Sequence, residues 1–323
     1  MKMGRFFIRI PAEMEGVRVD KALAELLSEH SRGTIQQWIK QGLVLVDGEI
    51  TKQKLKLCGT EILEFTLPSP QPSQSPAQDI DMDIDLDIIE EDDHLIVINK
   101  PAGLVVHPGA GNQDHTLLNG LLHHHADAAF LPRAGIVHRL DKNTTGLMVV
   151  AKTEQARQHL IEQLSNRQML RQYLALVNGV MISGETIDQP IGRHRNDRLR
   201  MAVTKSGKPA ITHTRVLRKF RNHCLLQANL ETGRTHQIRV HLSWRGHPVV
   251  GDKRYGHRYR PPPSASENLI QSLQGFQRQA LHAQKLSLVH PKSGEQKTWQ
   301  QAPPEDMVTL VRLLKEDAQT HSG

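Results

Sequence analysis

Apolar residues recur at helical spacing near the N-terminus and at strand spacing after it. VDKALAELL predicts a helix through its apolar positions Val19, Ala22, Leu23, Leu26 and Leu27. A second helix is predicted from Ser31, which can cap it, to about Lys40, with Gly42 at its end. LVLVDGEI then predicts two short strands around an Asp47-Gly48 turn. The first 67 residues therefore predict a small α/β unit.

The rest of the chain combines uninterrupted apolar runs with amphipathic helices. LIVINK, LVVHP, GLMVVAK, YLALVNG and LLQANLE are rich in Val, Ile and Leu and predict strands. EQARQHLIEQL and PEDMVTLVRLL predict helices, and the second places Met307, Leu310, Val311 and Leu314 on one face, which we expect to pack on its own core. This pattern predicts an α+β fold with a large sheet flanked by helices.

A change in composition separates the two parts. The stretch PSPQPSQSPAQ, residues 68–78, contains four prolines and three serines and no charge, which predicts an extended linker. A chain of 323 residues is long enough for about two domains. We therefore predict a small domain over residues 1–67, a linker over 68–79 and a large domain over 80–323.

Two stretches resemble metal sites, but neither has the required spacing. DIDMDIDLDII, residues 79–89, alternates Asp with apolar residues, so a half-buried strand is predicted. A calcium loop is the alternative, but its sixth position must be Gly, where Ile84 or Leu86 stands. Three consecutive histidines, 123–125, cannot all face one ion from a helix. We predict no metal site.

Charge and cysteine usage narrow the class of partner and the compartment. The net charge is +7, but residues 79–93 hold nine of the 34 acids and no Lys or Arg, so the rest carries 41 basic against 25 acidic residues, or +16. A basic surface favours a polyanionic partner, although a merely soluble basic protein is the alternative. The absence of a long apolar run predicts no contact with membranes, and the widely spaced Cys58 and Cys224 favour the reducing cytoplasm.

The first candidate for chemistry is HRLDKNTTGL, residues 138–147. Asp141 follows Arg139, precedes Lys142 and stands at a loop beside a predicted buried strand. Neighbouring cations favour the charged form of a carboxyl group, and a carboxylate is a candidate nucleophile at a sugar carbon. An ion pair that stabilises a turn is the structural alternative.

The second candidate is LETGRTHQIRVHL, residues 230–242. Thr235 can cap a helix that reaches about Arg245, with Gly246 after it. A helix N-terminus rich in basic residues is an anion site, so this segment could bind a phosphate or Asp141. The polar side chains of its first turns are Arg234, His236, Gln237, Arg239 and His241. In contrast, INKPAGLVVHPGAGN contains a turn over residues 100–103 but no P-loop, because no Gly-Lys-Ser/Thr follows its glycines.

Residues 18–65 resemble the S4 RNA-binding domain in the RVDKAL start, the SR-containing helix and the LVLVDG turn. The resemblance implies binding of structured RNA through the two-helix face. Arg32, Gln36 and Lys40 follow an i, i+4 row on the second helix and, with Arg18, are the candidate RNA contacts. A solvated polar face is the alternative interpretation of that row.

The large part resembles the pseudouridine synthases of the RsuA/RluA type. HRLDKNTTGL, INKPAGLVVHP, RQYLALV, TGRTHQIRVHL and QALHA stand in the order of that family, with RQY and TT as small departures. The resemblance implies a mixed, mainly antiparallel sheet and isomerisation of uridine to pseudouridine without a cofactor. It assigns Asp141 as the catalytic carboxylate, Arg239 as its partner and Tyr173 as the residue that stacks on the uracil.

The resemblance also implies the substrate and further contacts. It points to the branch of the family that acts on 23S rRNA or a large-subunit precursor, at the clustered uridines of the helix 69 hairpin loop. The substrate-binding residues that we predict from it are Arg139, Lys142, Leu281, Arg234 and His236. Alternatives are the same chemistry on another rRNA or tRNA uridine, a non-catalytic RNA-binding assembly factor, and a base-releasing nucleosidase. We expect a monomer.

Overall fold

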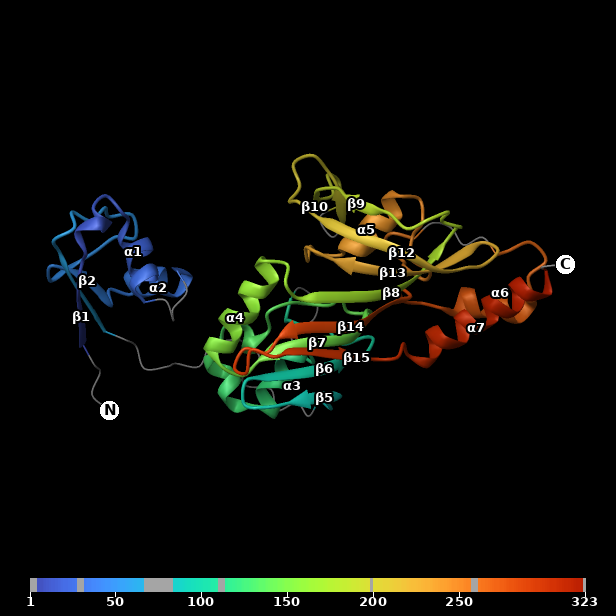
Figure 1. Ribbon diagram of the computed structural model, residues 1–323, viewed down its shortest axis with the longest axis horizontal. Helices are drawn as coiled ribbons and strands as arrows, with labels where there is room; N and C mark the ends of the chain where they lie inside the picture. The colour runs from blue at the N-terminus through green and yellow to red at the C-terminus, as the bar shows by residue number, and fades with distance from the viewer. Residues whose placement is uncertain are drawn as a thin grey trace. The chain divides into compact units, whose positions relative to one another are not determined.

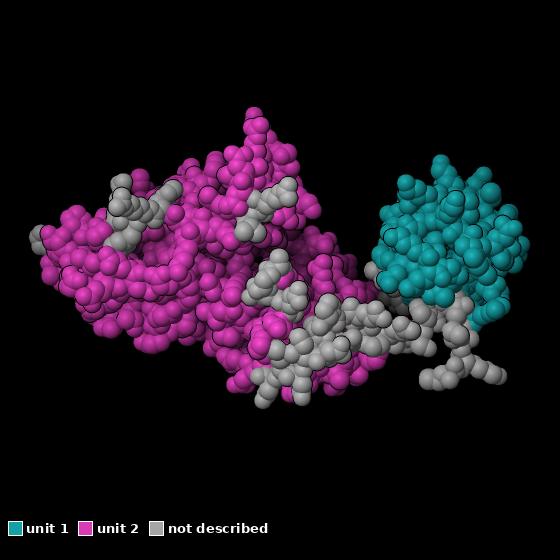
Figure 2. Space-filling model, turned by 180° about the vertical axis from the view of Figure 1, so that it is seen from behind, with its two compact units in different colours: residues 1–73 teal, residues 74–323 magenta. Residues whose placement is uncertain are grey.

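A computed structural model describes residues 5–27, 32–66, 84–109, 114–197, 200–256 and 261–321. The chain divides into two compact units, Met1–Ser73 and Gln74–Gly323 (Figure 2). The division falls within the segment predicted as a linker, whose own residues, 68–79, lie outside the described residues. None of the helices in the described ranges combines the length and apolar character that crossing a bilayer requires.

The small unit packs two helices on a four-stranded antiparallel sheet (Figure 1). The helices follow the predicted apolar spacing, and Asp47 and Gly48 both adopt positive φ, 48° and 83°, as a tight hairpin turn requires. Ser31, the predicted cap, lies outside the described residues. In chain order the elements are β1 Arg5–Arg9, η1 Ala12–Met14, α1 Val19–Leu26, α2 Arg32–Lys40, β2 Val44–Val46, β3 Glu49–Ile50 and β4 Ile62–Thr66.

Nine of the described strands of the large unit form one sheet in the order β5-β6-β7-β14-β8-β13-β12-β9, with β15 also paired to β14. Every pairing is antiparallel except that of β7 with β14, so the predicted mixed, mainly antiparallel sheet is confirmed. The strands are β5 Ile88–Glu91, β6 Leu95–Lys100, β7 Thr145–Ala151, β8 Leu170–Asn178, β9 Thr186–Asp188, β12 Ile211–Lys219, β13 His223–Leu230, β14 Leu281–Val289 and β15 Gln296–Gln300.

Helices and a separate hairpin complete the large unit. The hairpin joins β10 Ile191–Arg193 to β11 Met201–Val203, and α6 and α7 lie side by side (Figure 1). Met307, Leu310 and Leu314 of α7 are buried in the main core, and Val311 is partly buried against it, as its predicted apolar face requires. The helices are α3 Leu117–His124, η2 Ala126–Phe130, η3 Pro132–Gly135, α4 Glu154–Ser165, α5 Gln237–Trp244, α6 Glu267–Gly275 and α7 Glu305–Thr320.

The central strands are apolar at every position because both sheet faces are covered. In β7, Met148 and Val150 belong to the main core, whereas Leu147 and Val149 belong to a second core that includes Leu160 of α4. A strand buried on both faces reads as a continuous apolar run rather than an alternating one. This is why GLMVVA appears in the sequence without a polar face.

Three local predictions were wrong or only partly right. LVVHP forms no strand, because Val105 makes only an isolated bridge to Thr116. Residues 84–87 of the acidic run are not in a strand, although Ile84 and Leu86 pack against α3; the earlier part of that run lies outside the described residues. Helix α5 begins at Gln237, so Thr235 does not cap it.

The second core generates a stability prediction. Leu160 of α4 is fully buried, whereas its neighbour Ile161 is 38% exposed. Leu160→Ala should lower the free energy of unfolding by about 2–5 kcal/mol, because it leaves a cavity in a core that cannot collapse fully. Ile161→Ala, the control, should lower it by less than about 1 kcal/mol. Urea unfolding followed by fluorescence measures both, and equal losses would contradict this account of the core.

Candidate active site

A pocket of about 1240 Å³ opens over the middle of the large sheet. Its lining comes from segments that are far apart in sequence: the loop before β7, strands β8 and β14, and the start of α5. Of the residues predicted from the sequence, the lining includes Arg139, Asp141, Tyr173, Arg234, His236, Arg239 and Leu281. Lys142 is not among the lining residues, so its predicted role in substrate binding is not supported by its position.

Asp141 lies on a loop that lines the pocket. Hydrogen bonds of His138, before it, and of Thr144, after it, hold this loop in place. The amide of Val149 donates to Nε2 of His138 at 3.1 Å, and burial lowers the pKa of His138 to about 3, so this ring is a neutral acceptor. The amide of Thr144 donates to the carbonyl of Asp141 at 3.0 Å, and the Thr144 hydroxyl accepts from Gln279 at 3.1 Å. The loop therefore presents Asp141 from a fixed backbone.

Lys100 binds the backbone of the same loop through its buried side chain. Its ammonium donates to the carbonyls of Pro101, Leu104 and Lys142 at 2.7, 2.9 and 3.0 Å, and its side chain is essentially inaccessible. Burial lowers the pKa of Lys100 to about 7, while the charge of Asp141 opposes that shift. Three carbonyl acceptors match the three donors of an ammonium group, so this contact joins the KPAG turn to the backbone beside Asp141.

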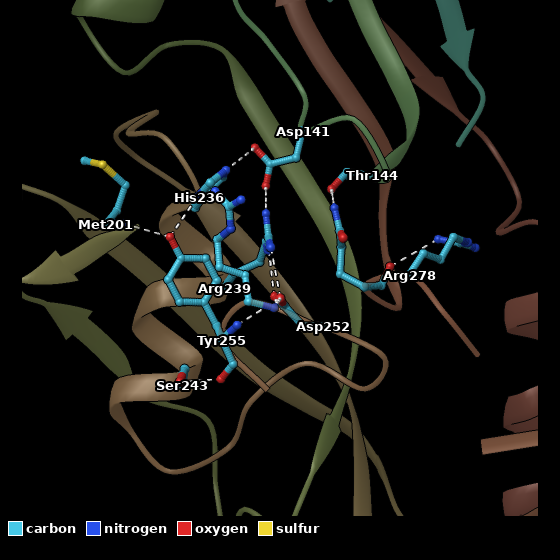
Figure 3. A network of polar contacts seen from close by, with 11 residues as sticks. Asp141, Thr144, Met201, His236, Arg239, Ser243, Asp252, Tyr255 and Arg278 are labelled. Atoms are coloured by element: carbon cyan, nitrogen blue, oxygen red, sulfur yellow. Dashed lines mark hydrogen bonds and ion pairs between the residues drawn. The ribbon is translucent and has the colours of Figure 1, made fainter. Parts of the chain in front are cut away.

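The guanidinium that contacts Asp141 is that of Arg239, 98 residues further along the chain (Figure 3). Its Nη1 donates to Oδ2 of Asp141 at 2.7 Å, whereas its Nε and Nη2 donate to the two oxygens of Asp252 at 2.6 and 2.9 Å. Arg239 thus contacts Asp141, its predicted partner, through one bond and Asp252 through two. That leaves Oδ1 of Asp141 facing the pocket.

Asp252 is the fully buried anchor of this arrangement. One of its oxygens also accepts from the backbone amides of Arg254 and Tyr255, at 2.9 and 3.1 Å. Burial alone would raise the pKa of Asp252, but the contacts with Arg239 and these amides lower it below its ordinary value. Burial alone would lower the pKa of Arg239, but its contacts with Asp252 and Asp141 raise that pKa well above the usual range. Asp252 and Arg239 are therefore both charged at neutral pH.

Tyr173 and Leu281 are two of the apolar residues that line the pocket. They lie on the neighbouring strands β8 and β14 and are 5% and 4% exposed. Burial raises the pKa of Tyr173 to about 12, with Arg171 opposing and Asp141 adding to the shift. The phenol is therefore protonated at neutral pH.

Three of the four residues predicted to contact RNA in the small unit bind one carboxylate, that of Asp20. The guanidinium groups of Arg18 and Arg32 and the amide of Gln36 all donate to Asp20, at 2.6–3.1 Å. Burial alone would raise the pKa of Asp20, but these three partners lower it. Lys40 is exposed at the end of α2. The two arginines remain partly accessible, with side chains 36% and 49% exposed.

Comparison with known proteins decides the family. A sequence model described as RNA pseudouridylate synthase matches residues 94–244, and one described as S4 domain matches residues 17–63. A relative called ribosomal large subunit pseudouridine synthase D, from Pseudomonas aeruginosa, is 50% identical over 97% of both chains. The protein of that name from Escherichia coli K12 is 50% identical over 95% of this chain and 93% of its own.

This chain belongs to the RNA pseudouridylate synthase family. Among solved structures, human RNA pseudouridylate synthase domain containing 4 is 28% identical, with a TM-score of 0.55 over 71% of this chain and 92% of its own. Human RNA pseudouridylate synthase domain containing 1 has a TM-score of 0.52 at 27% identity, over 68% and 84% of the two chains. The expected fold and enzyme class, a pseudouridine synthase with an S4 domain, are confirmed.

Sequence reasoning missed two members of the site in this pseudouridine synthase. Asp252 and Tyr255 both lie in HPVVGDKRYG, where an apolar run ends in Gly-Asp. A lone acid after such a run is a weak signal in one sequence, and only the fold shows that it meets Arg239. Tyr255 is buried beneath the same guanidinium, whose central carbon lies 5.0 Å from its ring centre.

Arg239→Lys tests the bridging geometry. A lysine cannot reproduce two bonds to Asp252 together with one to Asp141. Loss of one charge-assisted hydrogen bond costs about 1.5–3 kcal/mol, so kcat should fall by roughly 10- to 100-fold, measured as pseudouridine formed per enzyme.

The control for this variant is Arg278→Lys. Arg278 also contacts a carboxylate through two bonds, to Asp306 at 2.7 Å each, but it does not line the pocket. Its replacement should leave the rate within about twofold of wild type. Equal effects of the two variants would show that the position of Arg239 between its two acids is unimportant.

Proposed function

We propose that this pseudouridine synthase isomerises uridines of 23S rRNA, at the clustered uridines of the helix 69 hairpin loop, with Asp141 as the essential carboxylate. The relatives that are 50% identical over nearly the whole chain carry a name that specifies the large ribosomal subunit, which supports this substrate class. The observation that carries the catalytic assignment is the position of Asp141: one oxygen is bound by Arg239 and the other faces the pocket.

The chemistry requires little beyond this carboxylate and a site for the base. Uridine must lose its N1–C1′ bond, turn, and rejoin the sugar through C5, which is redox-neutral and calls for no electron carrier. Asp141 would act at the sugar, and Arg239 would keep it charged and oriented. Because Arg239 is itself held by Asp252, Asp141 would not have to reorganise as charge develops.

The carboxylates of the site favour isomerisation over simple base release. A typical glycosidase needs two carboxylates across the bond that breaks. Asp252 lies behind Arg239, fully buried. Glu231 lines the pocket but contacts Arg167 and His213. Asp141 is thus the carboxylate of this lining that has an oxygen available to a nucleotide.

Tyr173 and Leu281 would hold the uracil. The ring of Tyr173 would stack on the base, and Leu281 would pack beneath it, offsetting the few kcal/mol that extraction of a base from an RNA stack costs. With its pKa raised to about 12, the Tyr173 phenol would help proton removal from C5 only through a hydrogen bond, not as a resident phenolate.

Cations at the rim would contact the RNA backbone. Arg139 is exposed beside the pocket, where it would fill the gap left by the extracted nucleotide or hold its phosphate. Arg234 lines the same pocket and donates to the carbonyl of Pro209 through Nε, which leaves the outer end of its guanidinium for a phosphate.

The small unit would bind folded RNA through its two-helix face. Asp20 holds Arg18, Arg32 and Gln36 in one orientation, so these groups would meet phosphates without first being ordered. Lys40 would add an exposed charge at the end of α2. An enzyme that acts on ribosomal RNA would work in the cytoplasm, and we expect a monomer.

Tritium release tests the reaction and the carboxylate together. With 23S rRNA or large-subunit particles carrying tritium at uridine C5, wild type should release tritium, because C5 loses its hydrogen when it joins the sugar. Asp141→Asn, which keeps the size of the side chain and removes its charge, should reduce release by at least about 10⁴-fold.

The matched control is Asp127→Asn, a change of an exposed acid in η2 outside the pocket. Its release should equal that of wild type. Release by Asp141→Asn at the wild-type rate would remove the catalytic assignment. If wild type releases no tritium from either substrate form, the protein acts on another RNA target or is a non-catalytic RNA-binding factor.

Lys40→Ala tests the face of the small unit. If Lys40 contacts a phosphate, its loss should weaken binding equally for all RNA sequences and reduce the slope of log K against log salt by about one. Filter binding of the rRNA fragment at several salt concentrations measures this slope. Lys292→Ala, an exposed lysine between β14 and β15, serves as the control; an identical change in its slope would contradict a specific role for Lys40.

A further inference from the structure

The hydroxyl of Tyr255 lies between a backbone amide and a histidine of the pocket (Figure 3). The amide of Met201, in β11, donates to the hydroxyl oxygen at 2.9 Å, and the same oxygen lies 2.7 Å from Nδ1 of His236. The amide can only donate, so the hydroxyl accepts from it. Tyr255 is 4% exposed, and a buried hydroxyl hydrogen without a partner is costly. Its hydrogen is satisfied if it is donated to His236.

This arrangement selects one form of the His236 ring. A neutral imidazole carries its hydrogen on one nitrogen and accepts on the other. If Nδ1 accepts from Tyr255, the hydrogen of neutral His236 is on Nε2. That nitrogen lies 3.8 Å from Oδ1 of Asp141, the oxygen that Arg239 does not bind. The separation is too long for a hydrogen bond, so the N–H and the carboxylate oxygen face the pocket side by side.

The backbone and the charges around His236 are consistent with a neutral, fixed ring. His236 holds the position before α5 in the left-handed conformation, with φ of 58°, which is uncommon for a residue with a side chain. Burial, Arg239 and Arg254 lower its pKa, whereas Asp141 and Asp252 raise it; burial is the largest effect, and the pKa lies below its ordinary value. At neutral pH the ring is therefore uncharged.

We propose that Tyr255 is a positioning residue that keeps His236 in the Nε2–H form, and that His236 uses this N–H to donate a hydrogen bond to the uracil O2 of the target uridine. The proposal rests on the proposed function. When the N1–C1′ bond breaks, its electron pair moves onto the base and is shared with the carbonyl oxygens. A fixed donor at O2 stabilises that charge, and no proton is transferred.

The location of the two groups agrees with this role. Asp141 would face C1′, and His236 Nε2 lies 3.8 Å from its free oxygen, on the same pocket wall, where the first oxygen of the base beyond N1 would lie. Tyr255 also supports the site in a second way, because its ring packs under Arg239 and its amide binds Asp252. Tyr255→Phe keeps both of those contacts and removes only the hydroxyl.

The first experiment reads the tautomer without RNA. In protein labelled with ¹⁵N-histidine, a ring ¹⁵N–¹H correlation spectrum should show the His236 hydrogen on Nε2 in wild type. In Tyr255→Phe, Nδ1 loses its donor, so both tautomers should appear and the pKa of His236 should rise. Wild-type His236 with its hydrogen on Nδ1, or an unchanged ring in Tyr255→Phe, would overturn the proposal. This outcome does not depend on which RNA is the substrate.

The second experiment follows the reaction by single-turnover tritium release over pH 5–8. Tyr255→Phe should bind RNA as wild type does but react more slowly. Its rate should fall further as pH drops through the raised pKa of His236, because the imidazolium would then pair with Asp141. A wild-type pH profile for this variant would overturn the proposal. Thr186→Val removes a similar hydroxyl contact to Nδ1, at His213 outside the pocket, and should have no such effect.

Two replacements of His236 keep the test decisive if Tyr255→Phe does not fold. His236→Ala removes the donor and should slow the single-turnover rate roughly 100-fold. His236→Gln can place an amide N–H near the position of Nε2 and should recover at least about fivefold of that loss. Equal rates for the two variants would show that the N–H is not used. If wild type fails to release tritium while its His236 is the Nε2–H form, the proposed function fails and the tautomer assignment stands.

Discussion

The site depends on one buried guanidinium held between two carboxylates. Arg239 is almost fully enclosed, and an unpaired charge in that environment would cost several kcal/mol. Asp252 compensates most of that cost through two bonds and is itself fixed by two backbone amides. Asp141 then accepts one hydrogen bond from Nη1 of the same group. The pair of Arg239 with Asp252 thus provides rigidity, and the single bond to Asp141 leaves the other oxygen of that carboxylate facing the pocket.

The large sheet makes this interaction possible by joining segments that are distant in sequence. The parallel pairing of β7 with β14 aligns the start of β7, just after the Asp141 loop, with the strand that carries Leu281. On its other side, β14 pairs with β8, which carries Tyr173. Because both faces of the central strands are packed, a one-residue shift in register would move each side chain into the opposite core, whose packing it does not fit. The loop, the tyrosine and α5 therefore keep a constant geometry around the pocket.

Residues outside the pocket lining hold the lining residues in position. Lys100 binds three carbonyls beneath the Asp141 loop, and Tyr255 connects His236, Arg239 and the amide of Met201. These groups do not need to touch a nucleotide to matter, since they determine where Asp141 and His236 point. In the small unit, Asp20 has a comparable effect on Arg18 and Arg32, which it holds in one orientation while leaving them partly exposed.

The sequence by itself determined the local elements and the main candidates for the site. Helical spacing placed α1 and α7, Asp47-Gly48 placed the hairpin, and the motif resemblance assigned Asp141, Tyr173 and Arg239, because these signals depend on residues close together in the chain. The tertiary structure alone decided that Arg239 binds Asp252 with two bonds, that Tyr255 faces His236 and that Lys142 does not line the pocket. Contacts such as that of Asp141 with Arg239 join residues 98 positions apart, and they follow from strand order and loop path, which no local pattern encodes.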